Sequence, residues 1–183
     1  LAFWLSQQID VSLNHTNEKI RKNAEDLVSL MTPVVKSFFT DMGTEITNEA
    51  IQVFGGYGYT KDQGIEQLYR DNRITPIYEG TNSVQAIDLV FRKVLNNKIL
   101  LNFTSIVKEE IKINQETSEL KEFSKILSNN LRLLEDFSIL LEKMNKTNKD
   151  DVSAACNDFL KVLGYISLAF SWFKISKISF KKI

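Results

Sequence analysis

The chain has 183 residues, of which 43% are hydrophobic and 25% charged, so it can bury a sizeable core and fits one domain or one domain plus an extension. Its 23 basic residues balance its 23 acidic ones, which argues against a nucleic-acid or membrane-surface partner. The single cysteine, Cys156, cannot form an internal disulfide, and the single histidine, His15, leaves no Cys/His cluster for zinc. We therefore expect a reducing compartment and a cytoplasmic protein.

Helical patterns begin at the first residue. Leu1 opens the chain inside such a pattern, without a methionine or a signal-peptide pattern, which favours a fragment. Thr32 and Pro33 predict a helix start, because a proline in the first turn loses no hydrogen bond. Apolar residues then recur at three- and four-residue steps, and the pattern stops at Gly55 and Gly56. The members of this stripe are Val35, Phe38, Phe39, Met42, Ile46, Ala50 and Val53.

The middle of the chain predicts two more helices and the loop between them. A short helix is expected at residues 65–71, followed by an extended link through Pro76, because the residue before a proline avoids helical angles. Glu79 therefore falls on a loop, and Thr81 is expected to cap the next helix. The apolar face of that helix consists of Val84, Ala86, Ile87, Val90, Phe91 and Val94.

A polar stretch at residues 96–98 divides the chain into a domain of residues 1–95 and a helical extension of residues 96–183. Leucines recur every seven residues in the extension, at Leu120, Leu127, Leu134 and Leu141, and Asn130 interrupts the neighbouring seam. This repeat could form a coiled-coil dimer, but its short length between polar linkers favours a helix packed inside its own bundle.

The last helix, at about residues 151–178, is apolar on most sides and needs cover from several neighbours. Its longest uncharged run, residues 162–173, is shorter than the ~20 residues of a membrane-spanning helix, so we expect a core helix and no membrane span. No stretch of the sequence alternates between apolar and polar residues for long enough to predict a strand. The expected fold class is therefore all-α.

Two motifs lie between residues 52 and 82. They read Gln52-Val-Phe-Gly-Gly-Tyr-Gly-Tyr59 and Tyr69-Arg-Asp-Asn-Arg-Ile-Thr-Pro-Ile-Tyr-Glu-Gly-Thr-Asn82. The glycines follow a helix and lack Gly-x-Gly-x-x-Gly spacing, which excludes a Rossmann dinucleotide site. Glu79 stands between apolar residues and a Gly-Thr pair, so its carboxylate could project into a site that excludes water. Desolvation would make it a stronger base.

In this order the motifs resemble the C-terminal helical domain of the acyl-CoA dehydrogenases, where Gln-x-x-Gly-Gly-x-Gly precedes Arg-Asp-x-x-Ile and Ile-Tyr-Glu-Gly-Thr. The resemblance covers residues 20–95. The remainder is similar to the helical tail of longer family members, such as the 3-methylmercaptopropionyl-CoA dehydrogenase type. The resemblance implies a C-terminal helical bundle followed by a helical extension. It also implies that the N-terminal helical domain and the middle β-domain of the family are missing, which would leave the chain catalytically incomplete.

The resemblance also implies roles for single residues. Glu79 becomes the base that removes the α-proton of an acyl-CoA thioester while the β-hydrogen leaves as hydride to FAD, giving a trans-2-enoyl-CoA. Gly80 becomes a substrate contact near the thioester. The implied FAD contacts are Thr81, Asn82 and Ser83, together with Gln52, Val53, Phe54, Gly55 and Gly56, which would pack on the flavin nucleotide of a neighbouring subunit. The implied partners are acyl-CoA, electron-transferring flavoprotein and further copies of the chain in a homo-oligomer.

The residues alone leave alternatives open. The glycine loop and the start of the helix at Thr81 could be an ordinary helix stop and cap, although free amides at a helix N-terminus favour phosphate. An acyl-CoA oxidase or a nitroalkane oxidase would be related flavoenzymes, the latter disfavoured by glutamate rather than aspartate at position 79. The leucine repeat also suits a non-catalytic helical interaction module. Arg70, Asp71 and Arg73 could bind phosphate, but such a cluster beside a loop more often holds its shape through local salt links. Four tyrosines favour packing, at Tyr57, Tyr59, Tyr69 and Tyr78.

Overall fold

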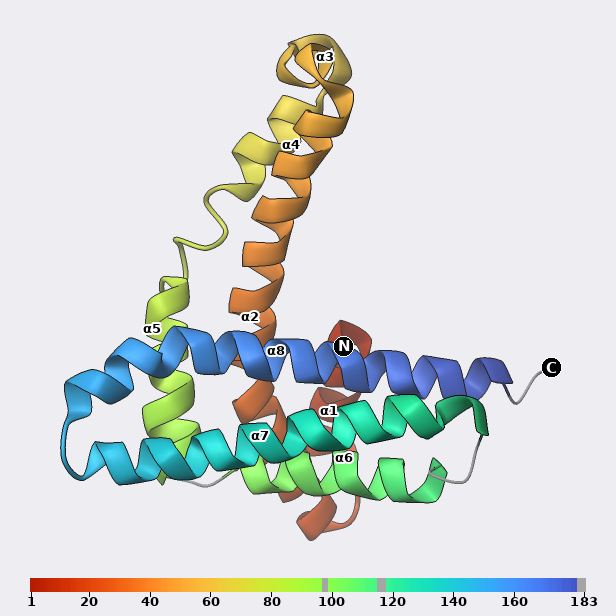
Figure 1. Ribbon diagram of the computed structural model, residues 1–183, viewed down its shortest axis with the longest axis vertical. Helices are drawn as coiled ribbons and strands as arrows, with labels where there is room; N and C mark the ends of the chain where they lie inside the picture. Colours follow the sequence, from red (N-terminus) through yellow and green to blue (C-terminus); the bar gives the residue numbers. More distant parts are fainter. Residues whose placement is uncertain (97–98, 115–117, 181–183) are drawn as a thin grey trace.

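The computed structural model describes residues 1–96, 99–114 and 118–180, and every regular element in these ranges is a helix, which confirms the all-α prediction. The elements are α1 (Ala2–Asn14), α2 (Glu18–Phe54), α3 (Gly56–Tyr59), η1 (Lys61–Gln63), α4 (Ile65–Asn72), α5 (Asn82–Ile87), the π-helical η2 (Asp88–Asn96), α6 (Leu100–Asn114), η3 (Ser118–Leu120), α7 (Lys121–Asn145) and α8 (Lys149–Phe180). The C-terminal half of α2 projects with α3 and α4 as an arm from a bundle of the other helices (Figure 1). Asn97 and Lys98, at the expected domain boundary, lie outside the described residues.

The predicted helix start at Pro33 is wrong, because α2 already begins at Glu18 and carries Pro33 in its interior. Asn17 is the actual cap, and its side chain accepts hydrogen bonds from the amides of Lys19 and Ile20 at 2.9 and 3.3 Å. An interior proline costs a helix about 3 kcal/mol. The neighbouring side chains of Met31 and Val34 are fully buried, and burial of such residues stabilises by about 1.5–3 kcal/mol each, which offsets that cost.

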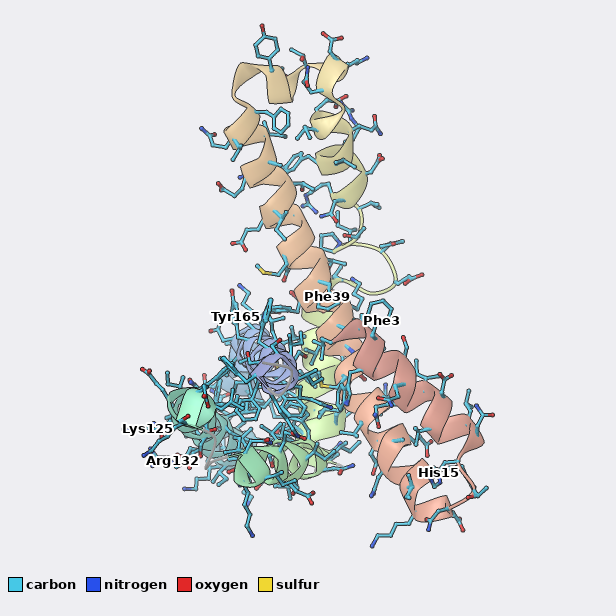
Figure 2. All side chains as sticks on the ribbon, turned by 90° about the vertical axis from the view of Figure 1, so that its right-hand side faces the viewer. Phe3, His15, Phe39, Lys125, Arg132 and Tyr165 are labelled. Carbon is cyan, nitrogen blue, oxygen red and sulfur yellow. The ribbon has the colours of Figure 1, made fainter. Side chains whose placement is uncertain are left out.

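In the predicted apolar stripe of α2, only the part nearest the bundle is buried. Phe38 is buried where α2 leaves the bundle, whereas Ile46 is 65% and Val53 83% exposed further along. Beyond the bundle α2 is covered mainly by α3 and α4, and its other sides carry free side chains (Figure 2). Tyr57 and Tyr59, at the tip of the arm, and Tyr78 are also exposed, so the prediction that they pack is wrong within this chain, whereas Tyr69 is half-buried.

The link between α4 and α5 is made of turns, so the expected extended conformation is also wrong. The amide of Thr75 donates to the carbonyl of Asn72, and the amide of Ile77 donates to that of Ile74, both at 2.9 Å. These turn hydrogen bonds outweigh the extended preference of the residue before a proline. The other predictions for this region are confirmed: α4 covers residues 65–72, Glu79 lies on a loop, and Thr81 caps α5 by accepting from the amide of Val84 at 3.4 Å.

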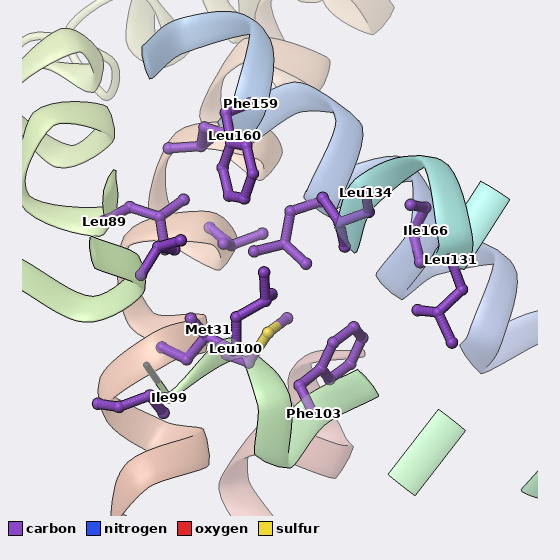
Figure 3. Close-up of a cluster of buried hydrophobic side chains, with 14 of the residues drawn as sticks. Met31, Leu89, Ile99, Leu100, Phe103, Leu131, Leu134, Phe159, Leu160 and Ile166 are labelled. Atoms are coloured by element: carbon purple, nitrogen blue, oxygen red, sulfur yellow. The ribbon is translucent and has the colours of Figure 1, made fainter. Parts of the chain in front are cut away.

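The extension packs on the bundle of the same chain, as predicted. The four leucines of the heptad repeat are all buried, and α7 lies along α8 and α6, so the repeat is one face of a helix inside its own bundle. Asn130 is exposed, and its amide donates to the carbonyl of Ile126. Leu134 joins Phe103 and Phe159 in a core that includes side chains from both halves of the chain (Figure 3).

The last helix is a core helix with one open face. Phe159, Leu163 and Phe170 are buried against neighbouring helices, whereas Tyr165 and Trp172 are 56% and 57% exposed. Within the described ranges, α8 is the one helix whose length and composition would also suit a membrane crossing, and 44% of its apolar window is buried inside the fold.

Candidate functional site

The loop that carries Glu79 is fastened to α2 at the point where the arm leaves the bundle. The side-chain amide of Asn82 donates to Asp41 Oδ1 at 2.7 Å and to Thr40 Oγ1 at 2.9 Å, and its oxygen accepts from Lys36 Nζ at 2.8 Å. The same amide also donates to the carbonyl of Ser37. These bonds use the side chain of Asn82 to hold the loop, and its backbone amide donates to the carbonyl of Pro76 at 3.2 Å.

Glu79 has a left-handed backbone conformation, with φ at 55°, and no other non-glycine residue among those described has a positive φ. This conformation costs an ordinary residue roughly 1–2 kcal/mol. Two side chains hold it in place, because Gln85 Nε2 donates to the carbonyl of Glu79 at 3.0 Å and Lys36 Nζ donates to that of Gly80 at 2.8 Å. Backbone strain maintained by such anchoring is typical of functional positions.

The expected exclusion of water around Glu79 is not found in this chain. The Glu79 side chain is exposed, and the apolar residues before it, Ile74, Ile77 and Tyr78, remain 48% to 53% exposed. The turns of the loop place these side chains on the surface, and no described element lies over them. A desolvated site at Glu79 therefore needs a wall from outside the described residues.

The tip of the arm carries the other predicted cofactor contacts. Gln52, Val53, Phe54, Gly55 and Gly56 are all exposed. Gly55 ends α2 with φ at 60°, and a Cβ built on either glycine would have no neighbour within 4 Å. Their backbone is therefore open to another molecule.

The tip and the Glu79 loop are far apart in one chain. Asn82 bonds to α2 at Thr40 and Asp41, and Gln52 lies about 12 residues further along the helix, or about 18 Å at 1.5 Å per residue. Figure 1 shows α3 at the tip of the arm and α5 in the bundle at its base. The structure therefore does not bring the two predicted groups of cofactor contacts together within one copy.

A polar pocket of about 230 Å³ lies between α2, α5 and α8, beside Asn82 and Ser83. Its lining residues are Ser37, Asp41, Asn82, Ser83, Asn157, Leu160 and Lys161. Ser37 is 1% exposed and its hydroxyl is buried without a hydrogen-bond partner in the wall of the pocket. Sequence analysis missed Asn157 and Lys161, because their spacing on the last helix looks like that of ordinary surface residues.

In the charged cluster before the loop, Arg70 forms a local salt link, as predicted, with its Nη2 3.4 Å from Glu66 Oε2. Asp71 instead accepts a hydrogen bond from the neutral amide of Gln67 at 2.7 Å. Arg73 lines a second pocket, of about 450 Å³, that opens between the base of the arm and α8. In the described part of the chain, no three His, Cys, Asp or Glu side chains gather closely enough to hold a metal ion.

The class of domain is an all-helical bundle with a projecting arm and an anchored Ile-Tyr-Glu-Gly-Thr loop. Comparison with known proteins shows which family has a similar domain. The family model "Acyl-CoA dehydrogenase, C-terminal domain" matches residues 7–94. Residues 7–94 are therefore similar to a C-terminal acyl-CoA dehydrogenase domain.

Individual relatives agree with this assignment. The chain is 42% identical over 83 residues to 3-methylmercaptopropionyl-CoA dehydrogenase of Ruegeria pomeroyi, a match that covers 45% of this chain and 14% of the relative. It is 38% identical over 90 residues to butyryl-CoA dehydrogenase of Syntrophomonas wolfei, covering 49% and 15% of the two chains. The structure of Caenorhabditis elegans ACDH-11 in complex with C11-CoA shares the fold over 94% of this chain and 29% of its own, with a TM-score of 0.76 and 23% identity.

Proposed function

We propose that this chain is the catalytic-base portion of a flavin-dependent acyl-CoA dehydrogenase, which converts an acyl-CoA to a trans-2-enoyl-CoA. The observation that carries the proposal is the anchored, left-handed Glu79 in a segment that matches the family domain. The names of the relatives support an acyl-CoA substrate. Electron-transferring flavoprotein is the proposed electron acceptor, on the family resemblance alone.

In this proposal Glu79 removes the α-proton of the bound thioester. The left-handed backbone of Glu79 is held by Lys36 and Gln85, and this fixes the position from which its side chain projects. The Glu79 side chain therefore loses little positional freedom when the substrate binds. Gly80 lets the backbone pass close to the thioester without a side chain in the way. A second wall over Ile77 and Tyr78 would desolvate the carboxylate and strengthen it as a base.

FAD, when bound, supplies the hydride acceptor that no side chain can provide. The residues present fit such a group in two places. The pocket beside Ser83 is lined by polar side chains that include Lys161, and the open glycines at the tip of the arm allow close approach of a nucleotide. Because these places are about 18 Å apart along α2, the tip would serve the cofactor of a second copy in a homo-oligomer.

The test of this function is Glu79→Gln in the flavoprotein that carries this chain. The variant should keep bound FAD and its melting temperature, while the rate of anaerobic flavin bleaching by acyl-CoA falls about 10²–10⁴-fold, since the proton acceptor is lost. Glu122→Gln, at an exposed position on α7, is the control and should bleach normally. Normal bleaching in Glu79→Gln would remove Glu79 from the role of base.

The 183-residue chain alone should fold but should not retain FAD. Its core spans both halves of the sequence, whereas the Glu79 loop is open to solvent and the two groups of proposed FAD contacts are apart. Purification should therefore give a colourless, strongly helical protein. A yellow stoichiometric complex after gel filtration would show that the chain holds far more of the cofactor site than we propose.

A further inference from the structure

Helix α8 of the extension reaches the proposed cofactor site. Asn157 and Lys161 are four residues apart on α8 and therefore lie on the same face of the helix. Asn157 Nδ2 donates to Ser83 Oγ at 3.4 Å, and both Asn157 and Lys161 line the 230 Å³ pocket at the start of α5. The extension is thus in direct contact with a residue that the family resemblance assigns to flavin binding.

The groups that line this pocket are suited to an anionic ligand. Lys161 has no carboxylate within ion-pair distance among the described residues, so its ammonium is free to bind an anionic ligand. Asp41 is the single carboxylate of the lining and already accepts a hydrogen bond from Asn82. The Ser83 hydroxyl accepts from Asn157, so its own hydrogen can donate to an oxygen in the pocket.

We propose that Lys161 binds a phosphate group of the cofactor in this pocket, and that Asn157 positions Ser83 for the same group. The proposal rests on the proposed function and assigns to the extension a part in cofactor binding. Lys161 supplies the positive charge that an anion needs beside Asp41, and the Ser83 hydroxyl supplies a neutral donor. The pocket is several times larger than the roughly 30 Å³ occupied by one water molecule, so it can hold a phosphate.

Inorganic pyrophosphate is a suitable probe for this site, because it carries the phosphate chemistry without the rest of the cofactor. Titration of the ¹⁵N-labelled 183-residue chain should shift the amide signals of Ser83 and Asn157, with an affinity that falls as salt is added. Lys161→Gln should weaken binding about tenfold, the loss expected for one charge-assisted hydrogen bond. Lys161→Arg should restore most of the affinity, because it keeps the charge.

Lys149→Gln is the matched control, since Lys149 is an exposed lysine at the start of the same helix and does not line the pocket. Its affinity for pyrophosphate should stay within about twofold of that of the original chain. Equal affinities for Lys161→Gln and Lys149→Gln would overturn the proposal, as would the absence of pyrophosphate binding. Circular dichroism of each variant checks that the helices are intact.

A second measurement separates this inference from the proposed function. In the flavoprotein that carries this chain, Lys161→Gln should lose FAD faster on dialysis than Lys149→Gln. Equal retention of FAD would overturn the role of Lys161 and leave the dehydrogenase function standing. A parent protein that binds no FAD would overturn the proposed function and the assignment of the pocket to that cofactor.

Discussion

Gly164 on α8 lies directly against the ring of Phe38 on α2, so closely that a Cβ built on the glycine would be 2.5 Å from Phe38 Cδ2. The ring is 4% exposed and packs edge-on against Tyr165 with its centroid 5.0 Å away. This contact fixes how closely the extension approaches the base of the arm. It therefore also determines whether Asn157 and Lys161 reach the pocket at Ser83.

Gly164→Ala should destabilise the fold by about 1–3 kcal/mol, because an added methyl group in a packed core forces the ring or the helix to move. Thermal unfolding followed by circular dichroism measures the loss. Gly56→Ala is the control, since a Cβ at that exposed position meets nothing within 4 Å. If the two variants melt at the same temperature, the close approach of α8 to Phe38 contributes nothing to stability.

The fold could be predicted from the sequence largely because local patterns and burial agree. The heptad leucines and the apolar side of α8 are stable only in a hydrophobic core, and the structure buries them there. The start of α2 was mispredicted because Pro33 is a local signal, and tertiary burial of Met31 and Val34 outweighs it. The exposed half of the apolar stripe, at Ile46 and Val53, could not be anticipated, since periodicity reports an apolar face without saying what covers it.

The candidate site was less predictable than the fold. The sequence motif identifies Glu79 and Thr81 as site residues. The anchoring of their loop, however, depends on Lys36 and Asp41, which are more than 35 residues away on α2. Contacts of such separation leave no periodic signal in a single sequence. The same reason hid Asn157, whose contact with Ser83 spans 74 residues.

The ion pair between Glu110 on α6 and Lys177 on α8 should make stability depend on pH. Partial burial raises the pKa of the Glu110 carboxyl, but the hydrogen bond and charge of Lys177 outweigh it and hold the pKa below its ordinary value. A carboxyl with a lowered pKa in the folded state stabilises the fold above its unfolded pKa, about 4.3, and this contribution disappears as pH falls further.

Glu110→Gln should therefore lower the free energy of unfolding at neutral pH by about 0.5–1 kcal/mol, as expected for a partly exposed pair. The difference from the original chain should shrink as pH falls below about 4.3, the unfolded pKa, and disappear as pH falls through the lowered pKa of the folded state. Urea unfolding across this range measures it. Glu109→Gln makes the same change of charge at an exposed neighbour and should show a smaller difference at every pH. A deficit that persists in acid would mean that Glu110 acts through packing instead.

The buried face of α7 is tested by two adjacent leucines. Leu134 is 0% exposed in the core between the two halves of the chain, whereas Leu133 is 58% exposed on the outer side of the same helix. Leu134→Asp would bury an unpaired carboxylate, which costs several kcal/mol, roughly, in addition to the lost apolar contact. We expect loss of helicity or aggregation on gel filtration. Leu133→Asp should change the free energy of unfolding by no more than about 0.5 kcal/mol, because its side chain stays in water. If both variants melt alike, α7 does not present this face to the core and the extension is not held on the bundle by the leucine repeat.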